Sequence, residues 1–221
     1  MFPTRPERND APIGVTTAAA SPTDSLGAIP TYGRLALAAL LAWLSWLAFH
    51  DAYGNVPIVT DISTAIHEFG HMLFMPFGIP ILGRTMVILG GSLTEVAFPL
   101  IFVWYFLRKG DDGRRDVFAA MVCVWWSSIG LLATAIYCAD SRAGKLMLLD
   151  GLTGQESDGH DWYNLLDRWG LLEQDTQIAR WMRMMAWLMC VGSIIVATWN
   201  ALQSRAITPN FSAQSQDYTK G

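Results

Sequence analysis

Charged residues are scarce in this chain. Asp, Glu, Lys and Arg make up 15% of its 221 residues, whereas 52% are hydrophobic. Soluble domains are usually about 25% charged, so the composition points to a lipid bilayer as the surroundings. The net charge is only -4 and no basic stripe alternates with aromatic residues, so we expect no nucleic-acid partner.

Cysteine is also rare. Cys123, Cys138 and Cys190 are odd in number, form no C-x-x-C pair and fall in or beside apolar runs. A free thiol in such a run packs as a small hydrophobic group. We therefore expect neither a disulfide framework nor a zinc ion held by cysteine.

Long apolar runs are abundant, and a helix that crosses the hydrocarbon core needs about 20 such residues. There are five runs, at residues 34–49, about 57–77, about 85–107, about 117–138 and about 182–202. They predict an all-α protein, a polytopic integral membrane helical bundle with about five membrane helices over residues 31–205. We expect it in a prokaryotic cytoplasmic membrane.

Both ends of the chain read as tails. Residues 1–30 contain five prolines among small polar residues and lack the apolar core of a signal peptide, and residues 206–221 are polar. Neither stretch has an apolar face to bury, so both are expected to be flexible in isolation.

The polar connecting segment, residues 139–180, contains one amphipathic piece. Its apolar residues recur at helical spacing after Asp161, a possible N-cap, and before Gly170, a stop; they are Trp162, Leu165, Leu166 and Trp169. This pattern predicts a short helix that lies either in the membrane interface or packed on the end of the bundle.

The stretch TAIHEFGHMLFM, residues 64–75, places two of the four histidines in an apolar run. His67 and His71 are four residues apart, so on a helix they share a face and can bind one metal ion. Glu68 projects beside them. This HExxH spacing predicts a zinc site in which Glu68 is the general base. The structural alternative is that the histidines hydrogen-bond to neighbouring helices and that Glu68 pairs with one of them.

A third zinc ligand is expected from residues 139–180, because the order of the runs returns this segment to the membrane face nearest the histidines. The candidates are Asp150, beside an apolar stretch that could dip into the bundle, then His160, and then Asp140 at the end of the fourth run. Asp161, water or no ligand at all complete the alternatives. As the neighbour of His160, Asp161 could also orient a histidine ring from outside the metal.

Glu95 lies about ten residues into the third run, near the depth expected for the histidines. It could support an imidazole or polarise a substrate. An equally open alternative is a protonated carboxyl, or one paired with a Ser or Thr of a neighbouring helix.

HExxH inside a membrane run is followed by Gly90-Gly91-Ser92-Leu93 and later by Leu149-Asp150-Gly151. This combination resembles the site-2 protease family of intramembrane zinc metallopeptidases. The resemblance implies that His67, His71 and Asp150 bind zinc, that Glu68 is the base, and that membrane-spanning substrates are cut. The link between the second and third runs is too short for an inserted domain, so the resemblance implies a minimal, divergent member.

We therefore expect a metallopeptidase-like protein that hydrolyses peptide bonds in or near the bilayer, with a membrane protein as its substrate. The alternative is a non-catalytic accessory subunit of a larger membrane complex, built on the same scaffold. In that case, partner chains would hold the two tails.

Overall fold

The computed structural model describes residues 29–78, 83–108 and 115–206. In these residues the regular structure is helical and no strand occurs. The helices are α1 (Thr31–His50), α2 (Val59–Gly78), α3 (Gly83–Leu107), α4 (Val117–Ala139), α5 (Asp161–Arg168), the short 3-10 helix η2 (Leu172–Gln174) and α6 (Asp175–Ala206). The predicted all-α class is confirmed. The tails expected at residues 1–30 and 206–221 lie almost wholly outside the described residues, so those expectations stay predictions.

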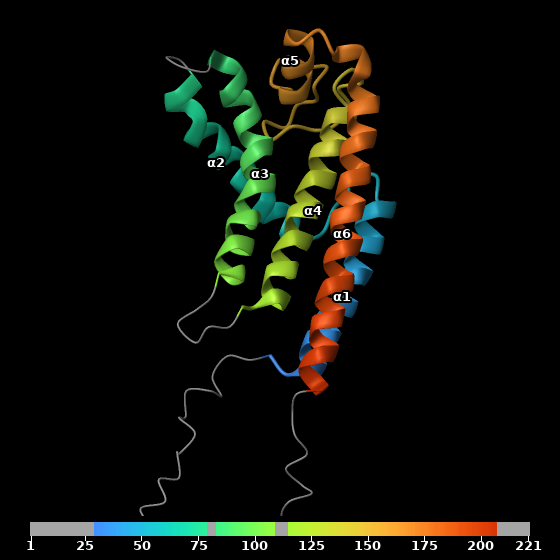
Figure 1. Cartoon of the computed structure of the whole chain (residues 1–221). Coiled ribbons are helices and arrows are strands. Elements are labelled where there is room, and N and C mark those ends of the chain that lie inside the picture. The colour runs from blue at the N-terminus through green and yellow to red at the C-terminus, as the bar shows by residue number, and fades with distance from the viewer. Residues whose placement is uncertain (1–28, 79–82, 109–114, 207–221) are drawn as a thin grey trace, which may run out of the picture.

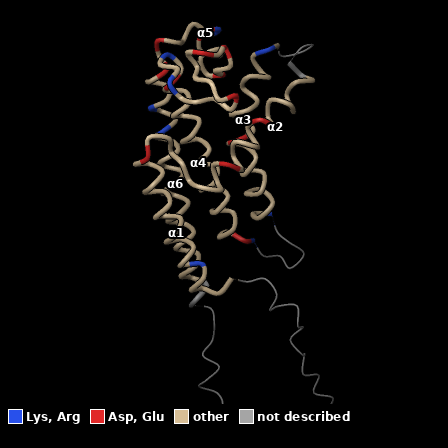
Figure 2. Tube along the Cα trace, turned by 180° about the vertical axis from the view of Figure 1, so that it is seen from behind, with Lys and Arg blue, Asp and Glu red and all other residues tan. Residues whose placement is uncertain are grey.

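Four of the described helices are long and apolar enough to cross a membrane. They are α1, α3, α4 and the continuous stretch of η2 with α6. α2, which corresponds to the second apolar run, is not among them. Charged residues gather at the end of the bundle that carries α5, and the lower parts of α1 and α6 are almost free of them (Figure 2). The protein is therefore a helical membrane protein.

The long helices run alongside one another with alternating directions (Figure 1). α3 leads away from the α5 end of the bundle, α4 returns to it, and α6 leads away again. α6 packs along α4 and α1, whereas α2 packs mainly along α3 and lies obliquely to the other helices. This order brings α5, the end of α2 and the start of α3 to the same end of the molecule.

Small and apolar side chains hold α1, α4 and α6 together. The buried cluster between these helices contains Leu41, Ala48, Trp125, Ile129, Leu132, Ala186 and Cys190. Within it, the indole nitrogen of Trp125 donates a hydrogen bond to Ser45 Oγ at 2.8 Å, and Cys190 Sγ lies 3.0 Å from the same oxygen. Small residues let helices approach closely in a bilayer, and bonds between side chains satisfy the polar atoms that lipid cannot solvate.

α6 begins at Asp175, earlier than the apolar run at about residue 182 suggested. The reason is an ion-pair cluster at its start. Arg142, in the loop after α4, contacts the carboxylates of Asp175 at 2.7 Å and Glu173 at 2.9 Å. These contacts stabilise a polar first turn that an apolar pattern does not reveal.

α5 packs on the end of the bundle, because Trp162, Leu165 and Leu166 are buried. This matches the second of the two placements expected for a short amphipathic helix. The N-cap predicted at Asp161 is wrong: the N-cap is His160, whose Nδ1 accepts a hydrogen bond from the backbone N–H of Tyr163. Asp161 is the first helical residue, and its carboxylate is thereby free to contact another helix.

Candidate metal centre

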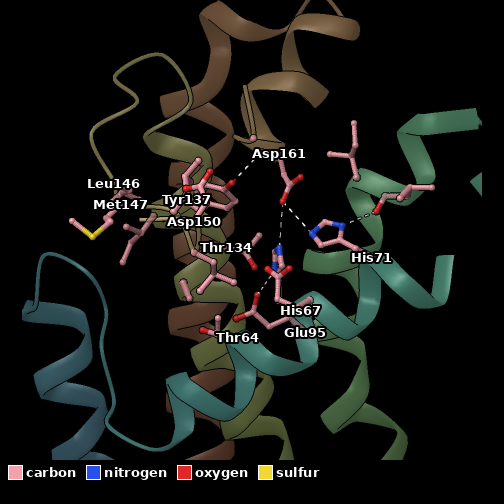
Figure 3. A pocket seen from close by; sticks show the side chains of 18 of the residues that line it. Thr64, His67, His71, Glu95, Thr134, Tyr137, Leu146, Met147, Asp150 and Asp161 are labelled. Atoms are coloured by element: carbon pink, nitrogen blue, oxygen red, sulfur yellow. Dashed lines mark hydrogen bonds and ion pairs between the residues drawn. The ribbon is translucent and has the colours of Figure 1, made fainter. Parts of the chain in front are cut away.

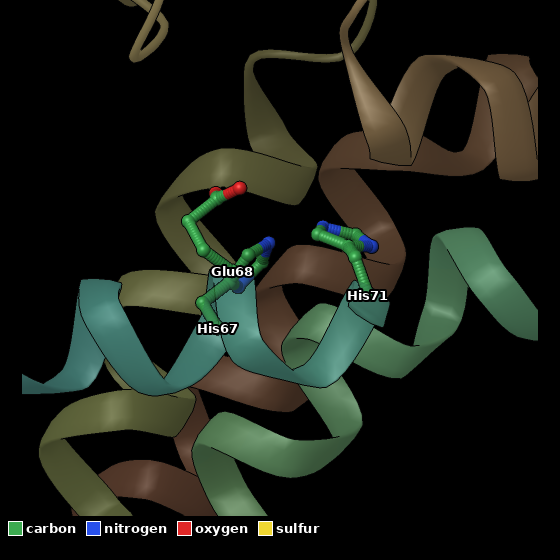
Figure 4. A group of neighbouring side chains, drawn as sticks. All are labelled: His67, Glu68 and His71. Carbon is green, nitrogen blue, oxygen red and sulfur yellow. The ribbon is translucent and has the colours of Figure 1, made fainter. Parts of the chain in front are cut away.

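α2 presents the two histidines of the HExxH motif side by side on one face of the helix (Figure 4). The rings of His67 and His71 have centroids 4.9 Å apart, and both face α3. Ligand atoms of His67, Glu68 and His71 lie within 4.8 Å of one another. Glu68 is on the exposed side of α2 and lines the same cavity as the histidines. The spacing therefore produces the shared face that the sequence predicted.

Acceptors on α3 form a hydrogen bond with Nδ1 of each histidine ring. His67 Nδ1 lies 3.0 Å from a carboxylate oxygen of Glu95, and His71 Nδ1 lies 2.8 Å from the backbone carbonyl oxygen of Val87. A carbonyl or carboxylate oxygen only accepts, so each Nδ1 is the donor. In a neutral imidazole the hydrogen then sits on Nδ1, and Nε2 keeps its lone pair for a ligand.

Asp161 closes the site from above (Figure 3). Its Oδ2 lies 3.1 Å from His71 Nε2 and 3.4 Å from His67 Nε2. Burial raises the pKa of Asp161, but when both rings are imidazolium ions their hydrogen bonds and charge outweigh burial and bring the pKa below its ordinary value. With Nδ1 protonated, three lone-pair atoms face one another at this point. Such an arrangement needs a positive charge between them, either protons on the rings or a metal ion.

Three consecutive residues of α3 shape the floor of this centre. A Cβ at Gly91 would lie 2.5 Å from Nε2 of both histidines, so only glycine leaves room there. A Cβ at Gly90 would lie 2.9 Å from the backbone oxygen of Gly70, which shows how closely α2 and α3 approach. Ser92 Oγ accepts a hydrogen bond from the indole nitrogen of Trp162 at 3.1 Å. The Gly90-Gly91-Ser92 segment therefore positions α2, the imidazoles and α5 together.

The other predicted ligands are engaged elsewhere. Asp150 accepts hydrogen bonds from the backbone N–H of Leu152 at 3.0 Å and from Ser157 Oγ at 3.1 Å. Its carboxylate thus closes a local turn, in which Gly151 has a φ of 80°. Asp150 lines the cavity but makes no contact with the two imidazoles among those the structure describes.

Asp140 and His160 form a separate pair. The Asp140 carboxylate accepts the backbone N–H groups of Lys145 and Leu146 at 3.0 and 2.8 Å. His160 Nε2 is buried and lies 3.5 Å from an oxygen of Asp140, just beyond a hydrogen bond of good geometry. Burial lowers the pKa of His160, and the nearby Asp140 opposes this effect only in part. The structure thus brings Asp161 to His67 and His71, in place of Asp150, His160 or Asp140.

The centre opens on a cavity of about 640 Å³. One wall carries the polar groups, and the loop at residues 146–150 supplies apolar side chains such as Leu146 and Met147 (Figure 3). Sequence reasoning missed Tyr137, whose hydroxyl oxygen accepts the backbone N–H of Asp161 at 3.0 Å. It lies inside an apolar run near the end of α4, so no motif singled it out.

Zinc fits the donor set of this centre. Catalytic zinc sites commonly have three protein ligands from imidazole nitrogens and carboxylate oxygens, and leave a fourth position open. Here two Nε2 atoms and Asp161 Oδ2 converge, each histidine is supported through its Nδ1, and the side chain absent at Gly91 leaves space beside both rings.

Comparison with known proteins gave no match: no family model, no curated protein and no solved structure is significantly similar to the chain. Fold and site together define a helical membrane protein with a cluster of two histidines and three carboxylates, those of Glu68, Glu95 and Asp161. Its function has to be argued from that cluster.

Proposed function

We propose that this protein is an integral membrane zinc metallopeptidase that hydrolyses peptide bonds in or beside the bilayer. His67, His71 and Asp161 would hold the metal, and Glu68 would be the general base. The observation that supports the proposal best is the hydrogen bonding of both Nδ1 atoms to acceptors on α3. It directs two Nε2 lone pairs toward the point that Asp161 Oδ2 also faces, and this orientation of the ligand atoms is what a metal site requires.

Zinc in this centre would polarise the carbonyl of the scissile peptide and lower the pKa of a water molecule to about 7. The Glu68 carboxylate would take one proton from that water. The water oxygen would bond to the carbonyl carbon, the C–N bond would break, and Glu68 would deliver the proton to the departing nitrogen. The products are a carboxylic acid and an amine, so atoms and protons balance. Glu68 suits this role because it lines the cavity and makes no hydrogen bond or ion pair within the described part of the chain.

Glu95 has a supporting role in this proposal. Glu95 is 7% exposed and its carboxylate contacts Nδ1 of His67, so it would hold the ring in place and increase the basicity of Nε2. The depth expected for Glu95 from the sequence agrees with this contact. With His67 as its partner, the burial of Glu95 requires neither of the two alternatives, a protonated carboxyl or a pairing with a serine or threonine.

The membrane arrangement completes the proposal. α1, α3, α4 and α6 would cross a prokaryotic cytoplasmic membrane, and α5 would lie near its surface. α2 would enter the bilayer obliquely, held by α3, with the exposed side chains of Phe69, Met72 and Leu73 against lipid. The chain would then be a minimal, divergent relative of the site-2 proteases, with Asp161 in the place that the resemblance gave to Asp150.

Metal analysis tests the centre directly. The purified protein should contain one zinc ion per chain, His67→Ala and His71→Ala should lose it, and Glu68→Gln should retain it. In vesicles, wild-type protein should cut a labelled membrane-spanning peptide, and Glu68→Gln should not.

Two other results would favour different readings. No stoichiometric zinc in wild-type protein would identify the cluster as two imidazolium ions paired with Glu95 and Asp161, and would overturn the proposal. Bound zinc with equally inactive wild-type and Glu68→Gln proteins would favour an accessory subunit, whose partner chains co-purification from the membrane would identify.

A further inference from the structure

Tyr137 is a polar group of the cavity wall that the proposed roles leave unused. It lies on α4, and its ring centroid is 6.4 Å from that of His67, in an edge-on arrangement. Its hydroxyl oxygen accepts the backbone N–H of Asp161, whose carboxylate contacts both Nε2 atoms. Asp161 therefore links the phenol of Tyr137 to the point where the proposed metal ligands converge (Figure 3).

The phenol ring is held rigidly. It stacks on His160 with centroids 4.3 Å apart and an interplanar angle of 25°. His160 is only 2% exposed, and its Nδ1 accepts the N–H of Tyr163, so its hydrogen is on Nε2 and faces Asp140 at 3.5 Å. The contact between His160 and Asp140 holds the stacked rings in place. Tyr137 consequently has a fixed direction relative to Asp161.

The hydroxyl still has a hydrogen to donate. The bond from Asp161 N–H uses a lone pair of the oxygen, and within the described residues the hydroxyl makes no second hydrogen bond. Two hydroxyls of the same cavity, those of Thr64 and Thr134, donate to carbonyl oxygens of their own helices at 2.9 Å. The other phenol, Tyr53, is 67% exposed. Among the described residues, Tyr137 is thus the partly buried hydroxyl of this wall whose hydrogen is uncommitted.

We propose that Tyr137 donates a hydrogen bond to the carbonyl oxygen of the scissile peptide as that oxygen gains negative charge. This inference rests on the proposed function, because it assigns a second stabilising group to the same centre. A fixed donor aimed at developing charge commonly contributes about 100- to 1,000-fold to kcat. The residue would touch the reacting oxygen directly, whereas His160 and Asp140 would act by positioning it.

A chelating probe tests this without a known substrate. Acetohydroxamate binds a metal through two oxygens, one of which is a carbonyl oxygen comparable to that of a peptide. The full-length protein is loaded with Co²⁺, its visible spectrum reports metal binding, and titration with acetohydroxamate gives a Kd. Tyr137→Phe removes the hydroxyl but keeps the ring on His160. Tyr53→Phe, from the same cavity, is the matched control.

The expected result is an acetohydroxamate Kd that rises about tenfold or more in Tyr137→Phe and is unchanged in Tyr53→Phe, with equal cobalt affinity in all three proteins. An unchanged Kd in Tyr137→Phe would overturn the inference and leave the metal centre standing. A cobalt affinity that falls as much as the hydroxamate affinity would also overturn it, because Tyr137 would then act only by holding Asp161. Wild-type protein that binds no cobalt would overturn the proposed function and this inference with it.

Discussion

Replacement of Gly91 by alanine is the most direct steric test of the centre. The added Cβ would lie 2.5 Å from Nε2 of His67 and of His71. Non-bonded heavy atoms rest at roughly 3.5 Å or more, so each ring would have to move by about 1 Å. The rings cannot yield cheaply, because Glu95 and the Val87 carbonyl hold their Nδ1 atoms.

A shift of about 1 Å is large for a metal site, in which ligand distances are normally kept within about 0.2 Å. We therefore expect Gly91→Ala to lower zinc affinity by at least about 100-fold, as measured by competition with a chromophoric chelator. Helical circular dichroism and a single elution peak in detergent would show that the variant is folded.

Gly192→Ala is the matched control. Gly192 lies in α6, where a Cβ would meet no atom within 4 Å. Zinc affinity should stay at the wild-type value, and helix propensity could stabilise the variant by up to about 1 kcal/mol. A folded Gly91→Ala protein with wild-type zinc affinity would refute the proposed site, because it would show that the Nε2 atoms beside Gly91 do not bind the metal.

Three further predictions concern the groups around the histidines. Asp161→Asn should weaken zinc binding far more than Asp150→Asn in the same chelator competition. The opposite order would favour Asp150, the ligand that the family resemblance implies. Glu95→Gln should lower zinc affinity by about 10- to 100-fold while the protein remains folded, because an amide supports the His67 ring less well than a carboxylate; an unaffected variant would mean that Glu95 is only a packed group. Ser92→Ala should leave the indole N–H of Trp162 without its acceptor and destabilise the docked α5 by about 1–3 kcal/mol. Thermal unfolding followed by tryptophan fluorescence measures this loss, and an unchanged transition would show that the hydrogen bond does not hold α5 in place.

The long helices were predictable because a bilayer leaves the backbone few choices. An apolar run that crosses lipid must satisfy its N–H and C=O groups internally, so the run itself marks the helix. α3 and α4 accordingly begin and end within two residues of the expected positions. α6 was predicted too short, because its first turns depend on the contact between Arg142 and Asp175, two residues far apart in the chain.

The site was predictable only where its geometry is local. The spacing of His67 and His71 within one helix determines that they share a face, whereas their contact with Asp161 depends on how α5 docks against α3. That docking rests on Trp162 and Ser92, which are 70 residues apart, and no periodicity encodes it. Asp161 was expected as a cap or a support for a ring and only last as a third ligand, because its neighbour His160 is the better intrinsic ligand. In the structure His160 caps α5, and the carboxylate of Asp161 contacts both imidazoles.

The first and last described helices bear on how the protein can be handled. α1 begins and α6 ends at the end of the bundle opposite α5, the end at which α3 also ends and α4 begins (Figure 1). If α1, α3, α4 and α6 each cross the membrane, Thr31 and Ala206 lie in the same aqueous compartment. The proposed metal centre then lies near the opposite membrane face. Reporter proteins fused before α1 or after α6 would thus report the same side of the membrane. An affinity tag at either position would leave the cavity accessible when the protein is immobilised.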